Sequence, residues 1–271
     1  MTVPAIGPRA AISVRRIATA RLAMLGLALM AGLACAAGAL PVIERVKGAV
    51  VAVGTWEPTR SPAFDYRGTG FAVDDGTLIV TNAHVLPGPL DGAKKESLAI
   101  AIPAPDGGKM QIREAKQVAV DAGADLALLR IDGAALPALS IGDSDAVMEG
   151  QGVFFTGFPL GTVLGLFAAT HRGFVAAITP IAIPRGRSAE LDPKVIRRLT
   201  SGPFAVFQLD ATAYPGSSGS PVFDPETGKV IGIINMVLVK GTKESVLTQP
   251  SGITYAIPSK HLQTLLQKAP L

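Results

Sequence analysis

Three short segments contain the residue types that nucleophilic catalysis requires. His84 lies in VTNAHVL (80–86), Asp125 opens the apolar run in GADLALLRI (123–131), and Ser218 lies in DATAYPGSSGSPVFD (210–224). A serine hydroxyl is a weak nucleophile until a neutral imidazole accepts its proton, and a carboxylate can hold that imidazole in the required tautomer. Taken singly, the histidine could be a structural residue, the aspartate a turn residue and the Gly-Ser-Pro segment a flexible loop. Their joint occurrence predicts a His84–Asp125–Ser218 catalytic triad.

The elements around these residues are short β-type runs separated by turns, which predicts an all-β fold. A first group of about six strands covers 48–55, 68–73, 77–81, 97–102, 111–120 and 125–131. A second group covers 152–158, 173–178, 204–210, 220–224, 230–239 and 252–257. We therefore expect two packed six-stranded antiparallel barrels, one within residues 40–144 and one within 145–271. The first group carries His84 and Asp125, and the second carries Ser218.

Two helices are predicted outside this strand pattern. LDPKVIRRLT (191–200) has a proline near its start and an apolar face, and it reads as a helical insertion. Its role is either surface decoration or a contact in gating or oligomerisation. PSKHLQTLLQK (258–268) places three leucines on one face, which predicts a C-terminal helix that docks on the second barrel.

At this point the chain resembles the chymotrypsin-like serine peptidases, and within them the HtrA/Deg branch. The resemblance covers about residues 45–260 and is carried by TNAHV (81–85), GADLALL (123–129), GFP (157–159), PGSSGSP (215–221) and GITYAIP (252–258). It implies a chymotrypsin-like two-barrel fold. Ser217 stands where the family usually has Asn, and Ser220 replaces its second glycine. The family's PDZ domain is absent from this sequence, so its PDZ-gated regulation is not expected here.

The resemblance also implies an oxyanion hole and a substrate pocket. The backbone N–H groups of Gly216 and Ser218 are expected to bind the developing oxyanion. Thr212 stands where digestive trypsin-like enzymes have an aspartate, so cleavage after Lys or Arg is disfavoured. With Ile233, Ile234 and Asn235 as one wall of the pocket, we expect cleavage after Val, Ala or Ile.

The N-terminal residues 1–39 read as a targeting segment. A basic region ending at Arg21 precedes the uncharged apolar run LAMLGLALMAGLACAAGAL, and Ala37-Gly38-Ala39 is suited to signal-peptidase cleavage. A cleaved signal peptide, an uncut membrane anchor and a lipid on Cys35 remain open. All three place the folded part outside the cytoplasm, and we expect the bacterial periplasm. Because Cys35 is the single cysteine, no intrachain disulfide is expected.

The distribution of charge argues against nucleic-acid binding, and the spacing of the histidines argues against a metal site. The net charge of +4 comes from four arginines before residue 40, and the other basic residues equal the 21 acidic ones in number. There is no basic stripe for nucleic acid. His171 and His261 have no Cys or His at ligand spacing, so neither a metal nor a cofactor is expected.

The function predicted is a serine endopeptidase that cleaves unfolded or misfolded proteins of the cell envelope. HtrA-like enzymes commonly form trimers, so the resemblance makes a homo-oligomer plausible for this chain. The alternatives are a processing peptidase with few targets and a catalytically silent scaffold that binds peptides.

Overall fold

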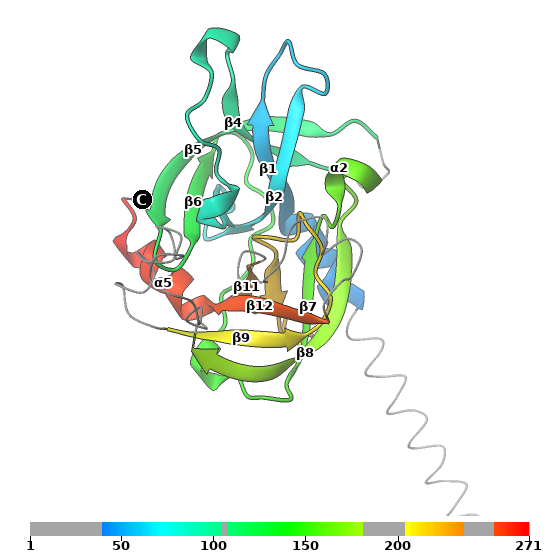
Figure 1. Cartoon of the computed structure of the whole chain (residues 1–271), viewed down its shortest axis with the longest axis vertical. Helices are drawn as coiled ribbons and strands as arrows, with labels where there is room; N and C mark the ends of the chain where they lie inside the picture. Colours follow the sequence, from blue (N-terminus) through cyan, green and yellow to red (C-terminus); the bar gives the residue numbers. More distant parts are fainter. Residues whose placement is uncertain (1–39, 105–107, 181–203, 236–251, 271) are drawn as a thin grey trace, which may run out of the picture. The chain divides into compact units, whose positions relative to one another are not determined.

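Short strands rich in valine, isoleucine and leucine close into two antiparallel barrels in the computed structural model (Figure 1). The structure describes residues 40–104, 108–180, 204–235 and 252–270. The predicted leader, the predicted helix 191–200 and the part of the predicted strand 230–239 beyond residue 235 lie outside these ranges.

The first barrel has the closed order β1-β2-β3-β6-β5-β4. Its strands are β1 (Val50–Trp56), β2 (Phe64–Val73), β3 (Leu78–Thr81), β4 (Ser97–Ile102), β5 (Gln111–Asp121) and β6 (Leu126–Ile131). The second barrel has the order β10-β11-β12-β9-β8-β7. Its strands are β7 (Gly152–Gly157), β8 (Ala169–Pro180), β9 (Ala205–Asp210), β10 (Pro221–Phe223), β11 (Val230–Ile234) and β12 (Ile253–Pro258). The predicted fold class is confirmed.

Each barrel has its own hydrophobic core. In the first barrel Val51, Val53, Ile79, Ile100 and Leu129 pack together. In the second, the packed residues include Phe155, Val175, Phe207, Leu209 and Val222. Burying one such side chain fully contributes about 1.5–3 kcal/mol relative to leaving it exposed. These cores make the barrel walls rigid, and the loops between strands are held on them.

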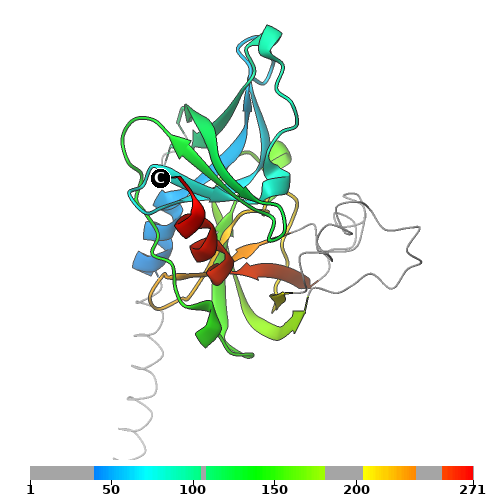
Figure 2. The ribbon, with the colours of Figure 1, turned by 90° about the vertical axis from the view of Figure 1, so that its left-hand side faces the viewer.

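The C-terminal helix α5 (Ser259–Lys268) lies alongside both barrels (Figure 2). It contacts β5 and β6 of the first barrel and β11 and β12 of the second. Leu262 and Leu265 are its buried leucines, as the apolar face predicted. The helix contacts the second barrel, as predicted, and its contacts extend to the first barrel as well.

The other helical segments are short. They are the 3-10 turns η1 (Ala83–Val85), η2 (Gly92–Lys94) and η3 (Ser144–Ala146), and the single-turn helix α2 (Gly161–Leu164). Residues 40–49 are also helical, so the strand predicted from residue 48 begins at Val50 instead. Val46 and Ala49 are both buried, and their spacing of three residues fits one helical face. Within the described ranges, no helix is both long and apolar enough to cross a membrane.

Candidate active site

His84 and Asp125 are brought together by the pairing of β3 with β6. Thr81 at the end of β3 pairs with Ala127 of β6, so the turn after β3 lies beside the start of β6. His84 follows in the 3-10 turn η1, and Asp125 directly precedes β6. The Asp125 carbonyl accepts hydrogen bonds from the Ala83 N–H at 3.1 Å and from the Asn82 side-chain amide at 3.0 Å. The two loops are thereby joined through their backbones.

The Asp125 carboxylate binds His84 twice. Its Oδ2 lies 2.7 Å from Nδ1 of the His84 ring, and its Oδ1 accepts the His84 backbone N–H at 2.9 Å. The carboxylate accepts a hydrogen bond from Nδ1–H, so in the neutral imidazole the available lone pair is on Nε2. Asp125 is 4% exposed, whereas the His84 side chain retains 24% exposure. The ring is therefore oriented from the buried side and can reach a substrate on the other.

Asn235 also donates a hydrogen bond to this carboxylate. Its Nδ2 donates to Asp125 Oδ2 at 2.8 Å, and its backbone N–H donates to the Tyr255 carbonyl at 2.9 Å. The residue is 1% exposed at the end of β11. The resemblance predicts Asn235 as part of a pocket wall, and that remains a prediction; the structure adds that its side chain binds Asp125 across the boundary between the barrels.

The segment before Ser218 is a tight turn with a specific peptide orientation. The Ser217 N–H donates to the Tyr214 carbonyl at 2.9 Å, and Gly216 has φ +98°. Proline at the second position and a positive φ at the third are the marks of a type II turn, here Tyr214–Ser217. The Pro215 carbonyl accepts the Leu160 N–H at 2.8 Å. Because C=O and N–H point in opposite directions in a trans peptide, the Gly216 N–H is directed away from Leu160.

Two backbone donors of this turn have no acceptor among the residues that the structure describes. They are the N–H groups of Gly216 and Ser218. The neighbouring Ser217, Gly219 and Ser220 N–H groups, in contrast, bind the carbonyls of Tyr214, Ile234 and Ser217. Two unpaired donors at alternate residues of one turn form a site for an oxygen that carries negative charge.

Two side chains on β2 of the first barrel bind this turn. The Tyr66 hydroxyl lies 2.6 Å from the Gly216 carbonyl oxygen and 2.9 Å from that of Phe158, and Thr69 Oγ1 donates to the Gly216 carbonyl at 2.8 Å. The Thr69 N–H donates to the Ser218 carbonyl at 2.8 Å. Burial raises the pKa of Tyr66, so its phenol stays protonated as a donor. Sequence reasoning did not identify Tyr66 or Thr69, since neither belongs to a catalytic motif.

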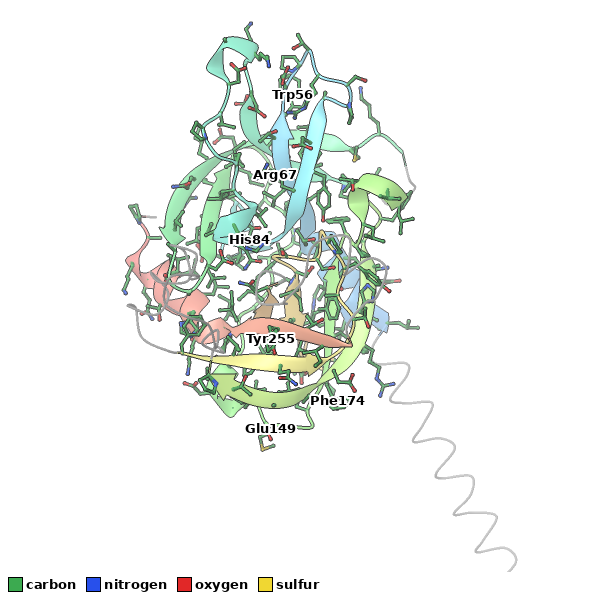
Figure 3. The ribbon with its side chains drawn as sticks, in the orientation of Figure 1. Trp56, Arg67, His84, Glu149, Phe174 and Tyr255 are labelled. Atoms are coloured by element: carbon green, nitrogen blue, oxygen red, sulfur yellow. The ribbon has the colours of Figure 1, made fainter. Side chains whose placement is uncertain are left out.

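Gly68 separates the histidine loop from the serine loop. A Cβ atom at Gly68 would lie 2.7 Å from Val85 Cγ2 and 3.1 Å from the Ser218 carbonyl oxygen. Figure 3 shows His84 between the strands of the first barrel and β12, where Tyr255 is labelled. Ser218 and His84 both lie within the described residues, and no hydrogen bond joins Ser218 Oγ to the His84 ring. In free enzymes such catalytic hydrogen bonds are often long and tighten when the substrate binds.

The residues predicted for the substrate pocket have different surroundings. Thr212 is half-buried just after β9. Ile233 and Ile234 are fully buried, and Ile234 packs in the core of the second barrel. The Ile234 backbone binds the serine loop, accepting the Gly219 N–H at 3.0 Å and donating to the Ser220 carbonyl at 2.9 Å. In the described ranges, no group of three or more His, Cys, Asp or Glu side chains could hold a metal ion.

Comparison with known proteins identifies the class of this fold and site. The family model of the trypsin-like peptidase domain matches residues 68–233, and the chain belongs to this family. A DegP-like periplasmic serine endoprotease of Chlamydia trachomatis is 34% identical over 194 residues, and one of Halomonas elongata is 30% identical over 191. These alignments cover 71% and 70% of this chain but 31% and 32% of the relatives. The chain thus spans about a third of the length of the curated relatives it matches.

The solved structure of the HtrA-type protease AlgW with a tripeptide has the same fold. It superimposes with a TM-score of 0.55 at 24% sequence identity, covering 83% of this chain and 61% of AlgW.

Proposed function

We propose that this protein is a serine endopeptidase in which Ser218 is the nucleophile, His84 the general base and Asp125 the residue that orients His84. One observation carries the proposal: the free N–H groups of Gly216 and Ser218 lie in the same turn as a serine, beside a histidine hydrogen-bonded to a buried aspartate. Membership of the trypsin-like peptidase family and the DegP-like relatives support it.

The reaction proceeds through an acyl-enzyme. His84 Nε2 takes the Ser218 hydroxyl proton as Oγ attacks the carbonyl carbon of the peptide, and the imidazolium that forms is stabilised by the Asp125 carboxylate. The carbonyl oxygen becomes negatively charged and is bound by the Gly216 and Ser218 N–H groups. His84 then gives its proton to the leaving amine as the C–N bond breaks. Water, activated by the same histidine, hydrolyses the ester and restores Ser218.

A fluorophosphonate probe tests the nucleophile without requiring the natural substrate. The full-length wild-type protein is expected to be labelled, whereas Ser218→Ala and His84→Ala are not. The matched control is Ser140→Ala, an exposed serine outside the site, which should be labelled like the wild type. A folded wild-type protein without labelling, also in the presence of an unfolded protein, would support the silent scaffold instead.

The substrate class we propose is unfolded or misfolded polypeptide of the cell envelope, which agrees with the periplasmic names of the relatives. Degradation of casein to many fragments is the expected result, and a single cleavage in one envelope protein would support the processing peptidase. In a peptide library we expect cleavage after Val, Ala or Ile; strong cleavage after Arg would contradict the pocket assignment of Thr212 and Ile233.

Location and assembly are further parts of the proposal. We propose export to the periplasm, with the leader cleaved, kept as a membrane anchor or lipidated on Cys35, and a homotrimer as the working oligomer. Fractionation of cells producing the full-length protein tests the first, and light scattering of the purified protein tests the second. Recovery in the cytoplasm, or a monomeric mass, would contradict the respective part.

A further inference from the structure

An exposed arginine is held beside the histidine loop and has no carboxylate partner among the described residues. Arg67 on β2 donates through Nε to the carbonyl of Val85, the residue after His84, at 2.9 Å. The two terminal amino groups of its guanidinium have no hydrogen-bond acceptor, and Arg67 has no ion pair, in the part of the chain that the structure describes. The side chain is therefore oriented by one donor, and its remaining four N–H bonds have no acceptor among the described residues.

Arg67 is also close to the serine loop along the same strand. The next residue, Gly68, packs between Val85 and the Ser218 carbonyl, and the one after it, Thr69, binds that carbonyl through its N–H. Figure 3 shows Arg67 on the same side of the first barrel as His84. The guanidinium thus lies at the edge of the site where the two catalytic loops meet.

The mechanism indicates which half of the substrate passes Arg67. This step rests on the proposed peptidase function. His84 must protonate the leaving amine, so the part of the substrate after the cleaved bond lies on the His84 side of the reacting carbonyl. Arg67 is bonded to the residue that follows His84 and is therefore next to this leaving half.

A guanidinium with free parallel N–H groups is suited to a carboxylate, which it can bind through two charge-assisted hydrogen bonds. The acidic residue of β2, Asp65, forms no ion pair with Arg67. We propose that Arg67 binds an acidic side chain within the first three residues after the cleaved bond and so determines specificity on the leaving side.

Peptides that differ only in having a carboxylate or its uncharged amide on one side chain test this assignment. Each carries Val before the cleaved bond and either Glu or Gln at one of the three following positions. The wild type is expected to prefer Glu at one position by about three- to tenfold in kcat/KM at low salt, since a bidentate contact at an exposed site is only partly screened. The preference should fall to below twofold in Arg67→Gln, be intermediate in Arg67→Lys, and weaken for the wild type in 0.5 M salt, where the Debye length is below about 5 Å.

The control variant is Lys268→Gln, which removes the same unit of charge from the exposed end of α5 and should keep the full Glu preference. An equal Glu/Gln ratio in the wild type, or a ratio unchanged in Arg67→Gln, would overturn the role of Arg67. Binding of the same peptides to Ser218→Ala, measured by fluorescence anisotropy, keeps the test independent of turnover. If the wild type shows neither probe labelling nor turnover, but Ser218→Ala still binds the Glu peptide more tightly than the Gln peptide, the peptidase function is refuted. The binding of an acidic side chain by Arg67 is then still supported.

Discussion

Replacing Gly216 with alanine tests the oxyanion-binding turn most directly. A Cβ at this position would lie 2.6 Å from the Phe158 carbonyl oxygen, 2.8 Å from the Tyr66 hydroxyl and 2.9 Å from Tyr66 Cε1. Real Cβ atoms essentially never approach other atoms within 3.0 Å. The φ of +98° adds strain of about 1–3 kcal/mol for a residue with a side chain. Both effects are relieved if the Pro215–Gly216 peptide rotates, and this rotation turns the residue 216 N–H away from the oxyanion.

The expected loss follows from the number of donors removed. One of the two donors is lost, and losing one oxyanion donor typically lowers kcat by about 10²–10³, which corresponds to about 2.7–4 kcal/mol of transition-state stabilisation. The substrate side chains still reach their sites, so KM should change much less than kcat. The assay is steady-state hydrolysis of a Val peptide together with the rate of fluorophosphonate labelling.

The matched control is Gly150→Ala. Gly150 has φ +86° and nothing within 4 Å of its added Cβ, so the backbone strain is similar and the steric conflict is absent. This variant should lose stability to urea but keep kcat. If Gly216→Ala is folded and its kcat stays within about threefold of the wild type, the assignment of the Gly216 N–H as an oxyanion donor is wrong.

Substitutions at three further residues give additional tests. Tyr66→Phe removes the hydroxyl that binds the Gly216 carbonyl, and such a hydrogen bond contributes about 0.5–1.5 kcal/mol. Fluorophosphonate labelling should therefore slow about three- to tenfold. An unchanged labelling rate would mean that Thr69 alone holds the turn. Asn235→Ala removes a donor to Asp125 and should lower kcat about tenfold. Asn235→Asp should lower kcat further, because it places a second carboxylate beside Asp125. A lower kcat in Asn235→Ala than in Asn235→Asp would indicate that Asn235 has a packing role instead. Burial lowers the pKa of His171, so this ring is neutral when folded and takes up a proton more readily when unfolded. The stability contributed by its neutral form is therefore lost as the pH falls below about 6.5, and His171→Phe should reduce the drop in urea midpoint between pH 7.5 and 5. An equal drop in the variant and the wild type would exclude His171 as a source.

Local patterns in the sequence were sufficient to predict most of the strands. The short apolar run SLAIAI (97–102) is β4 without any change of bounds, because an apolar run of this length is typical of a buried strand and its four central residues are indeed buried. The outer ends of β2 and β8 were not predicted, because Phe64–Tyr66 and Ala169–Arg172 belong to the strands through backbone pairing with β1 and β7, which no run of apolar side chains indicates. Residues 48 and 49 were predicted as strand but continue a helix, since a short apolar run is compatible with either.

The sequence by itself therefore determined the two-barrel fold, the terminal helix and the three segments that hold His84, Asp125 and Ser218. Those features follow from residues that are close together in the sequence, such as the apolar runs of the strands and the Gly, Ser and Pro residues of the turns. Only the tertiary structure decided that Asn235 donates to Asp125, that Tyr66 and Thr69 hold the Gly216 carbonyl, and that Arg67 is bonded to the histidine loop. These contacts join residues from separate strands, and the chain must close both barrels before the partners meet. Their residue types alone, an amide, a phenol, a hydroxyl and a guanidinium, are compatible with many other partners.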